Sequence, residues 1–482
     1  RAAETDFDPR TRIWYQKAMG SESQIGSDFY RFASTGETGT TIARRTPGGR
    51  AVVAADLTLR ELAVGIAAQR VSPSSEILVF DRAGLVLVSE REVETPPSSH
   101  VDPEAGLHQN HLTELELPVF DSLYQSYLGG MTALAERLLQ RIARTGPMTL
   151  AEYMAECLLH PAHGYYTRRD PLGRAGDFIT APEISQMFGE LIGLALAQSW
   201  LDQGAPARIT LAELGPGRGT LMADALRATR AVPGFHAALS VHFVETSPVL
   251  RRAQASAVPD AHWHDTADTL PDAPLFLIAN EFFDALPIRQ FIRDGNCWRE
   301  RMVGLEGNSL AFGLSTPAPI ALLEHRLADT RDGDLVEHCP ALPGIIQTIS
   351  HRIATHGGAA LIIDYGDWQS LGDTLQALAG HARTDPLTSP GQADLTAHVD
   401  FAAIAAATAP AKFTRLTPQG VFLERLGITQ RAQVLARTLT GTSLENHIAA
   451  HRRLTHPAEM GDLFKVIGIY PATATPPPGL EP

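Results

Sequence analysis

Short apolar runs alternate with amphipathic segments through the second half of the chain. Strands are predicted where apolar residues cluster between turn signals, at 207–215, 239–245, 261–264, 274–280 and 359–364. Helices are predicted where apolar residues recur with helical spacing, at 220–230, 247–257 and 342–355. Strands that alternate with helices indicate a parallel sheet, whose ligands bind beyond the carboxyl ends of the strands. This part of the chain is therefore predicted to have an α/β fold.

Additional helices are predicted before this series. Apolar residues from 134 to 142 follow helical spacing, and Thr149 with Glu152 forms a capping-box signature. The segment Thr180-Ala-Pro-Glu183 gives a second such signature, with proline in the first turn. The helix that starts there would turn these residues toward a core: Ile184, Met187, Phe188, Leu191 and Ala195.

The first 130 residues follow a different pattern. Alternation of apolar and polar residues predicts a strand at 50–56 and a hairpin over 76–89 that turns at 81–84. Helical spacing predicts a helix over 57–70 between them. The order strand, helix, hairpin indicates a separate α+β region.

The composition fits a soluble globular protein with two or three domains, since the 482 residues are 44% hydrophobic and 20% charged. A formal charge of −14 argues against a broad nucleic-acid-binding surface, which needs a basic face. The three cysteines lie far apart, which favours neither a disulfide framework nor a metal site and suits a reducing compartment. No apolar run approaches the ~18 residues of a membrane span, and no signal-peptide pattern is present. We expect a cytoplasmic protein without a metal.

One turn carries three glycines between a predicted strand and a predicted helix, in the stretch Glu213-Leu-Gly-Pro-Gly-Arg-Gly-Thr220. Glycine lets a ligand approach main-chain N–H groups, and the following helix N-terminus favours an anion. Thr220 stands where the dinucleotide fingerprint G-x-G-x-x-G requires glycine, which argues against an NAD-dependent dehydrogenase. A tight structural turn is the alternative interpretation.

Acidic residues follow two strands at the same predicted edge of the sheet. Glu245 ends the strand after the glycine loop, where an acid can bind ribose hydroxyls; a solvated strand end is the alternative. The segment 280–287 follows the fourth strand, so Glu281 and Asp284 would face a second substrate beside a bound nucleoside. Two carboxylates can orient a planar guanidinium cation, although a pair of acids can instead cap a turn.

Several long motifs of the second region resemble the MidA-type class I methyltransferases and occur in the family's order. They are Gly176-Asp-Phe-Ile-Thr-Ala-Pro-Glu183, Glu213 to Thr220, Asn280-Glu-Phe-Phe-Asp-Ala-Leu-Pro287, Asp364-Tyr-Gly366, Gly372-Asp-Thr374, Ala393-Asp-Leu-Thr-Ala-His-Val-Asp-Phe401, Gln419-Gly420 and Met460-Gly461. The resemblance covers about 131–475 and implies a Rossmann-like, seven-stranded sheet with extra helices. It also implies S-adenosylmethionine as the cofactor.

The same resemblance implies a protein substrate. The family includes the mitochondrial assembly factor that methylates an arginine of respiratory complex I, so the expected acceptor is an arginine guanidinium of a complex I subunit or a similar assembly client. The expected cofactor residues are Gly176, Asp177, Glu213, Gly215, Gly217, Gly219, Glu245 and Asp265. The expected catalytic residues are Asn280, Glu281 and Asp284, followed by the second-tier candidates His398 and Asp400.

We expect the three loop glycines to surround the amino-acid part of the cofactor. Glu213 would anchor the loop or the cofactor's amino group, and Glu245 would bind the ribose. Asp265 would meet the adenine edge or remain an ordinary loop acid. Gly176 and Asp177 would close over the cofactor, although Asp177 could equally cap a helix.

The N-terminal region resembles the Cache (PAS-like) sensor domains of bacterial chemoreceptors. The resemblance rests on Asp8-Pro-Arg-Thr-Arg-Ile-Trp-Tyr-Gln-Lys-Ala18, Phe29-Tyr30 before Thr35-Gly36, and Val52-Val-Ala-Ala-Asp56-Leu57. It implies a pocket for a small amino-acid-like ligand, lined by Arg12, Trp14, Tyr15, Tyr30 and Asp56. A hydrophobic strand edge with a satisfied arginine is the alternative.

Membrane helices normally flank such sensor domains, and neither flank is present. We therefore expect a truncated sensor fragment (1–128) joined by natural or artificial fusion to a complete methyltransferase domain (131–475). A proline-rich disordered tail (476–482) is expected to follow. The competing hypothesis from another functional class is a sensor-linked assembly scaffold that binds S-adenosylmethionine without turnover.

Overall fold

The computed structural model describes two separate parts of the chain. The described residues are 13–20, 25–26, 30–31, 38–46, 52–58, 78–80, 86–89, 132–168, 180–307, 309–380 and 382–482. The chain divides after Gly130 into two compact units, and each is described by itself.

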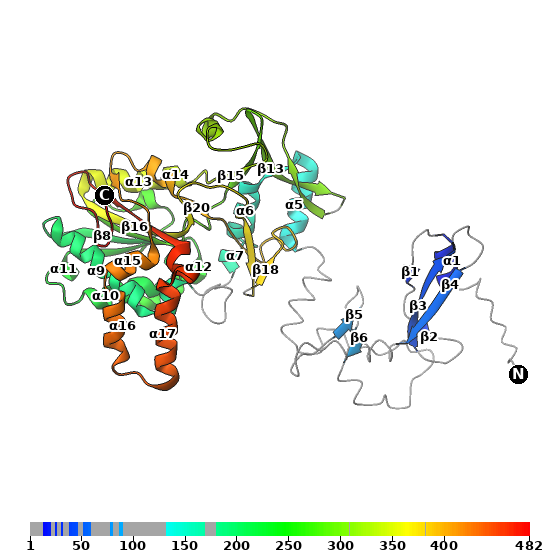
Figure 1. The fold of residues 1–482 in the computed structure, drawn as a ribbon, viewed down its shortest axis with the longest axis horizontal. Helices are drawn as coiled ribbons and strands as arrows, with labels where there is room; N and C mark the ends of the chain where they lie inside the picture. The colour runs from blue at the N-terminus through cyan, green and yellow to red at the C-terminus, as the bar shows by residue number, and fades with distance from the viewer. Residues whose placement is uncertain are drawn as a thin grey trace, which may run out of the picture. The chain divides into compact units, whose positions relative to one another are not determined.

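The first unit contains a small antiparallel sheet and a two-stranded hairpin (Figure 1). Its elements are α1 (Ile13–Met19), β1 (Ile25–Gly26), β2 (Tyr30–Arg31), β3 (Thr38–Arg45), β4 (Val52–Thr58), β5 (Leu78–Phe80) and β6 (Val86–Ser89). Strand β3 pairs with β1, β2 and β4, and α1 packs against β3. The antiparallel pairing of β5 with β6 confirms the two strands of the predicted hairpin.

The proposed sensor residues lie on several of these elements. Trp14 and Tyr15 belong to α1, Tyr30 to β2 and Asp56 to β4, whereas Arg12 lies outside the described residues. Strand β4 continues through Thr58, so the start of the helix predicted from residue 57 is wrong, and residues 59–70 lie outside the described part.

A central sheet organises the second unit (Figure 1). Its main strands are β8 (Ile209–Leu214), β9 (Leu239–Val244), β10 (His262–His264), β11 (Leu275–Asn280), β16 (Gly358–Asp367), β21 (Lys412–Phe413) and β23 (Phe464–Tyr470). Within the described residues they follow the order β10-β9-β8-β11-β16-β23-β21, and only β23 runs antiparallel to its neighbours. Two short strands, β20 (Val399–Asp400) and β22 (Thr417–Pro418), extend β16 and β23. The predicted Rossmann-like α/β sheet is confirmed.

Helices cover both faces of this sheet because its strands are apolar on both sides. Along β8, Ile209 and Leu211 pack into one core cluster with α9 and α10, whereas Ala212 and Leu214 pack into another with α13 and α14. The helices of this unit are α5 (Ala133–Thr145), α6 (Leu150–Leu159), α7 (Tyr165–Arg168), α8 (Ala181–Ile184), α9 (Gln186–Asp202), α10 (Thr220–Thr229), α11 (Phe235–Ala238), α12 (Pro248–Ala257), α13 (Leu342–His356), α14 (Phe401–Ala407), α15 (Gln419–Arg425), α16 (Ile428–Ala436) and α17 (Gly441–Thr455). Figure 1 shows α16 and α17 projecting from the domain as a helical hairpin.

Two smaller antiparallel sheets adjoin the central sheet. One consists of β7 (Met148–Thr149), β12 (Arg289–Asp294), β13 (Cys297–Glu306), β14 (Ser309–Leu314) and β15 (Leu335–His338). The other consists of β17 (Gln376–Ala379), β18 (Ala382–Thr384) and β19 (Asp394–Thr396). Residues of both sheets share a core cluster with α5 and α6, which fixes the smaller sheets beside the carboxyl ends of the central strands.

The helix starts agree only in part with the sequence patterns. Thr149 and Glu152 form the predicted capping box. Thr180 makes no side-chain capping bond, and the helix predicted from it is split at Ser185 into α8 and α9. Glu183 instead accepts a hydrogen bond from the Thr220 hydroxyl at 2.6 Å, so the second capping box is wrong.

The C-terminal residues 476–482, expected to form a disordered tail, are instead packed against the domain. Leu480 is 8% exposed and joins the core cluster of α9 and α10. Glu481 forms an ion pair with Arg425 at 2.7 Å and accepts a main-chain hydrogen bond from Arg415. Burial of one apolar side chain and one ion pair thus order this segment, although its prolines and glycine predicted disorder. Among the described helices, none is long and apolar enough to cross a membrane.

Candidate active site

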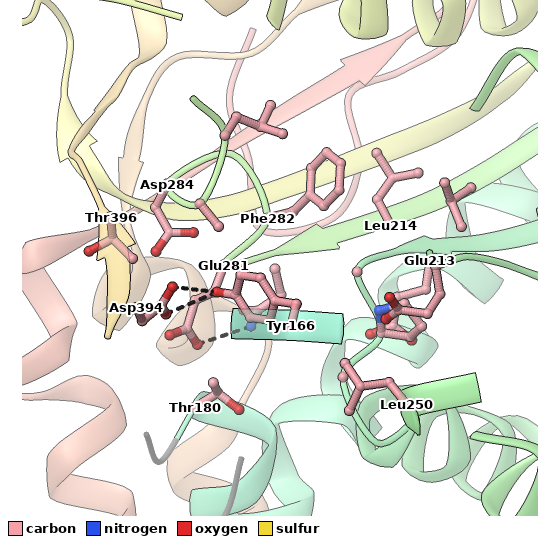
Figure 2. A pocket seen from close by; sticks show the side chains of 18 of the residues that line it. Tyr166, Thr180, Glu213, Leu214, Leu250, Glu281, Phe282, Asp284, Asp394 and Thr396 are labelled. Carbon is pink, nitrogen blue, oxygen red and sulfur yellow. Dashed lines mark hydrogen bonds between the residues drawn. The ribbon is translucent and has the colours of Figure 1, made fainter. Parts of the chain in front are cut away.

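A cavity of about 820 Å³ lies at the carboxyl ends of the parallel strands. Figure 2 shows Glu213 on one side of it and Asp394 and Thr396 on the other, with Glu281 and Tyr166 between them. The lining residues considered fall into two groups. The glycine-loop half comprises Glu213, Gly215, Gly217 and Glu245, and the acidic half comprises Asn280, Glu281, Asp284 and Asp394.

The glycine loop requires glycine at the positions that the sequence pattern indicated. The φ angles of Gly215, Gly217 and Gly219 are +58°, +55° and +81°, in the left-handed region that other residues avoid. A Cβ on Gly215 would lie 2.9 Å from Cδ2 of Phe282. Gly215 and Gly217 line the cavity, whereas Gly219 precedes α10 and is not among the lining residues.

Glu213 is the penultimate residue of β8 and is 3% exposed. Its Oε2 atom has no hydrogen-bond partner within the described residues, although the residue lines the cavity. Burial raises the pKa of Glu213 well above its usual value. Within the part of the chain that the structure describes, no hydrogen bond ties this carboxyl to the glycine loop. Of its two expected roles, the geometry therefore favours accepting a hydrogen bond from a ligand.

Glu245 is held in place by a polar network. Its Oε1 accepts from the Ser247 amide at 2.7 Å, and its Oε2 accepts from Nε2 of Gln254 at 3.2 Å. The same Gln254 nitrogen donates to the Gly217 carbonyl at 2.7 Å, and its Oε1 accepts from Trp263 at 2.8 Å. Burial raises the pKa of Glu245. Gln254 therefore joins the glycine loop to the proposed ribose acid.

Sequence reasoning missed Gln254, which is completely buried on α12. The available signal was a polar residue on the inward face of the predicted helix. Asp265 does line the cavity, but its carboxylate is 79% exposed and pairs with Arg251 at 2.6 Å. Gly176 and Asp177 lie outside the described residues.

Glu281 begins the acidic half in an unusual backbone conformation, with φ at +50°. Such strain at a residue other than glycine is concentrated at functional sites. Its Oε1 accepts from the Ala181 amide at 3.2 Å and from Nδ2 of Asn280 at 3.1 Å. Burial, together with the nearby carboxyl of Asp284, raises the pKa of Glu281 to about 7.

Asp284 is 6% exposed, and its Oδ1 has no hydrogen-bond partner within the described residues. Burial raises the pKa of Asp284 to about 6. The turn that carries Asp284 is organised by another residue, Asp364. Its Oδ2 accepts from the amides of Phe282, Phe283 and Asp284 at 3.2, 3.0 and 3.3 Å. Because Asp364 caps the turn, the side chains of Glu281 and Asp284 are not needed for that purpose.

Tyr166 and Asp394 form a contact that the sequence did not suggest. The Tyr166 hydroxyl lies 2.8 and 2.9 Å from the two carboxylate oxygens of Asp394, to which it donates. The Tyr166 carbonyl accepts from the Ser247 hydroxyl at 2.7 Å, on the glycine-loop side. Asp394 lies in the quoted motif 393–401, whose second-tier candidates were other residues.

Those second-tier candidates, His398 and Asp400, have different positions in the structure. His398 lines the cavity, with its ring packed edge-on against Tyr365 at a centroid distance of 5.4 Å. Asp400 instead caps α14 by accepting from the Ala403 amide at 2.9 Å, so its role is structural. Phe282 lines the cavity, and Phe283 is buried in the core.

The orphaned atoms of the cavity indicate which ligands it fits. Glu213 Oε2, Asn280 Oδ1 and Asp284 Oδ1 are buried oxygens that lack a partner within the described residues, and all three residues line this cavity. Buried polar atoms normally have partners, so these acceptors fit ligands with N–H donors or positive charge. The ammonium group and ribose hydroxyls of S-adenosylmethionine, and a guanidinium, have this character.

Comparison with known proteins agrees with this chemistry. The family model for S-adenosyl-L-methionine-dependent methyltransferases matches residues 191–419. The mitochondrial protein arginine methyltransferase NDUFAF7 of Bos taurus is 37% identical over 374 residues, which cover 71% of this chain and 84% of the relative. The Homo sapiens protein is 38% identical over 377 residues, with the same coverage.

A solved structure is also similar. A Burkholderia thailandensis protein crystallised with S-adenosyl-homocysteine shares 29% sequence identity, with a TM-score of 0.60. The match covers 73% of this chain and 93% of that protein.

Proposed function

The chain belongs to the family of S-adenosylmethionine-dependent methyltransferases that includes the mitochondrial protein arginine methyltransferases, and from that premise we propose that it methylates an arginine side chain of a protein. It is a class I methyltransferase with S-adenosylmethionine as its cofactor. The observation that supports an arginine acceptor is the pair of carboxyls at the cavity, the half-buried Glu281 and the buried Asp284.

The residues of the glycine-loop half would hold the cofactor. When bound, it supplies an electrophilic methyl group on a sulfonium. Glu213 offers its unpartnered oxygen to the ammonium group, and Glu245 offers its carboxylate to the ribose hydroxyls. Gln254 keeps Glu245 and the Gly217 carbonyl at a fixed separation, so these contacts are organised before the ligand arrives.

The acidic half would hold the acceptor. A guanidinium is planar and cationic, so two carboxylates can bind it through its N–H groups and orient one nitrogen for attack. Glu281 is already fixed by the Ala181 amide and Asn280, which limits its movement. With a pKa of about 7, its carboxylate can accept the proton that the methylated nitrogen loses near neutral pH.

A respiratory complex I subunit, or a similar assembly client, is the protein substrate that we propose. This step rests on the family resemblance of the sequence motifs, and the acidic cavity is compatible with it. Incubating the chain with candidate subunits and locating the modified residue by mass spectrometry would identify the client.

The acceptor proposal is tested by the chemical identity of the product. The full chain is incubated with methyl-labelled S-adenosylmethionine and peptides that contain arginine, lysine or glutamine, and the hydrolysed products are separated. We expect label only in methylarginine, nearly absent with Glu281→Gln and unchanged with Glu324→Gln, an exposed residue outside the cavity. Label in methyllysine would contradict the acceptor. Binding of S-adenosyl-homocysteine without any transfer would favour the scaffold hypothesis.

For the N-terminal unit we propose binding of a small amino-acid-like ligand, as its Cache-like motifs imply. The side chains expected to act are those of Arg12, Trp14, Tyr15, Tyr30 and Asp56. Calorimetric titration of the full chain with free amino acids would test this, with Asp56→Ala expected to abolish the signal. An unchanged signal in that variant would contradict the assigned pocket.

A further inference from the structure

The three-stranded sheet β18-β17-β19 forms one wall of the acidic half. Alternate residues face opposite sides of a strand, and here Ala377 and Leu395 join the core cluster of α6. On the other face Gln376, Leu378 and the β19 residues Asp394 and Thr396 line the cavity. The sheet is therefore anchored by one face and presents the other to the acceptor.

Strand β18 is the outer edge of this sheet. It pairs with β17, and no other strand within the described residues pairs with it. Its residues, Ala382 to Thr384, are all exposed. Open strand edges pair readily with an extended segment of another chain.

Arg383 is the residue of β18 that lines the cavity. It stands opposite Leu378 in the antiparallel register, and its guanidinium makes no hydrogen bond or ion pair with the part of the chain that the structure describes. Burial lowers the pKa of His398 in the cavity, and the charge of Arg383 lowers it further, which places that charge near the acidic half. The neighbouring Arg301, by contrast, pairs with Asp373 at 2.6 Å.

The acidic half thus carries charges of two signs in different places. Glu281 is a half-buried acid and Asp284 a buried one, whereas Arg383 is an exposed cation on the edge strand. A peptide whose only charge is its target arginine would satisfy the acids and leave Arg383 without a partner. A peptide with a carboxylate close to the arginine would satisfy both.

We propose that Arg383 selects protein segments in which an acidic residue lies close to the methylated arginine, and that the segment lies extended along the edge of β18. The inference rests on the proposed function, because it assumes that the acids receive an arginine. In an extended segment, residues two positions apart face the same side. The acidic preference is therefore expected two residues from the target arginine, opposite Arg383.

Reversing the charges of the enzyme and of its substrate peptide by substitution tests this inference. Amidated arginine peptides with Asp, Asn or Lys two residues from the target are compared by kcat/KM. For the wild type we expect Asp to exceed Asn by about threefold and Lys by about tenfold, as for a solvent-exposed ion pair. Arg383→Glu should reverse the order, and Arg383→Gln should make the three peptides equivalent. The matched control, Arg437→Glu at the exposed C-cap of α16, should keep the wild-type order.

The possible outcomes distinguish failure of the proposed function from failure of the inference about Arg383. If the wild type methylates lysine peptides, or binds S-adenosyl-homocysteine but methylates no arginine peptide, the proposed function fails and the inference fails with it. If arginine peptides are methylated at equal rates whatever their flanking charge, or if Arg383→Glu keeps the preference for Asp, only the inference is overturned. A peptide with a free terminal carboxylate and no acidic side chain is compared by kcat/KM with the amidated Asp peptide. The comparison shows whether Arg383 accepts a terminal carboxylate as well as a side-chain carboxylate.

Discussion

The two halves of the cavity are built in opposite ways. In the glycine-loop half, Gln254 joins the Gly217 carbonyl, Glu245 and Trp263 in one network, and only Glu213 keeps a buried oxygen without a partner within the described residues. In the acidic half, Asn280 and Asp284 each keep a buried oxygen without a partner within the described residues. The network of the first half is organised before its ligand arrives, whereas the unpartnered oxygens of Asn280 and Asp284 in the second half await a ligand with hydrogen-bond donors.

This difference assigns different work to the two halves. Under the proposed function, a network of satisfied bonds would fix the position of a cofactor that is the same in every cycle. Carboxyls with raised pKa values, at the half-buried Glu281 and the buried Asp284, would under the proposed function favour a cationic acceptor and take its proton. Changes in the acidic half should therefore affect catalysis, and changes in the glycine-loop half should affect cofactor affinity.

The largest effect is expected from Glu281→Gln. The amide retains the size of the side chain but cannot accept a proton or pair with a guanidinium, so kcat should fall about 1,000-fold. The dissociation constant of S-adenosyl-homocysteine, measured by calorimetry, should stay within about twofold because the glycine-loop half is unchanged. Asp284→Asn is expected to act mainly on the acceptor KM. An equal loss of cofactor affinity would show that the halves are not separable.

A glycine substitution should produce the opposite result. In Gly215→Ala the new Cβ would lie 2.9 Å from Phe282, which lines the cavity and would have to move. An overpacking cost of about 2 kcal/mol would weaken S-adenosyl-homocysteine binding about 30-fold. Gly295→Ala is a matched control because its φ of +59° is nearly that of Gly215, at +58°, but no atom lies within 4 Å of its Cβ position. Gly295 lies outside the cavity, so equally weak binding in both variants would indicate a general loss of stability rather than the contact with Phe282.

The same contrast explains what the sequence could predict. The glycine loop and Glu245 belong to one strand–helix–strand unit, so their spacing along the chain carried the information. Glu281 and Asp284 could be placed at the cavity because they follow a strand end at the same edge. The contact between Tyr166 and Asp394 joins positions 228 residues apart, and no periodicity in the sequence indicates it.

The sequence predictions were wrong where a local pattern suggested a local contact but the residue has a distant partner in the fold. Thr180 and Glu183 had the spacing of a capping box, but Glu183 bonds to Thr220 across the domain. A tertiary hydrogen bond replaced the local one. Similarly, the last residues looked disordered by composition, yet burial of Leu480 holds them in place. In both cases the decisive partner lies far away along the chain.

The pH dependence of acceptor turnover should report the acidic half. The pKa values of Glu281 and Asp284 are raised to about 7 and about 6, so each carboxyl is protonated, and unable to bind a cation, below those values. We expect kcat/KM for the acceptor to fall as pH decreases from 8, by about tenfold per unit once below the controlling pKa. In Glu281→Gln, the part of this fall near pH 7 should disappear. A profile that is flat between pH 5 and 8 would contradict the role of these acids.

The smallest effect is expected at Gln254, and it tests the comparison most directly. Gln254→Met keeps an unbranched side chain of similar length but removes the bonds to Gly217 and Glu245. Both of those residues line the cavity, so water can replace part of what is lost, and the remaining cost of about 1 kcal/mol corresponds to about fivefold weaker cofactor binding. The KM for S-adenosylmethionine should rise by that factor while kcat at saturation stays unchanged, because the acidic half keeps its geometry. A fall in kcat without a change in KM would mean that the network positions the acceptor as well, through Ser247 and its bond to Tyr166, and the division between the two halves would have to be given up.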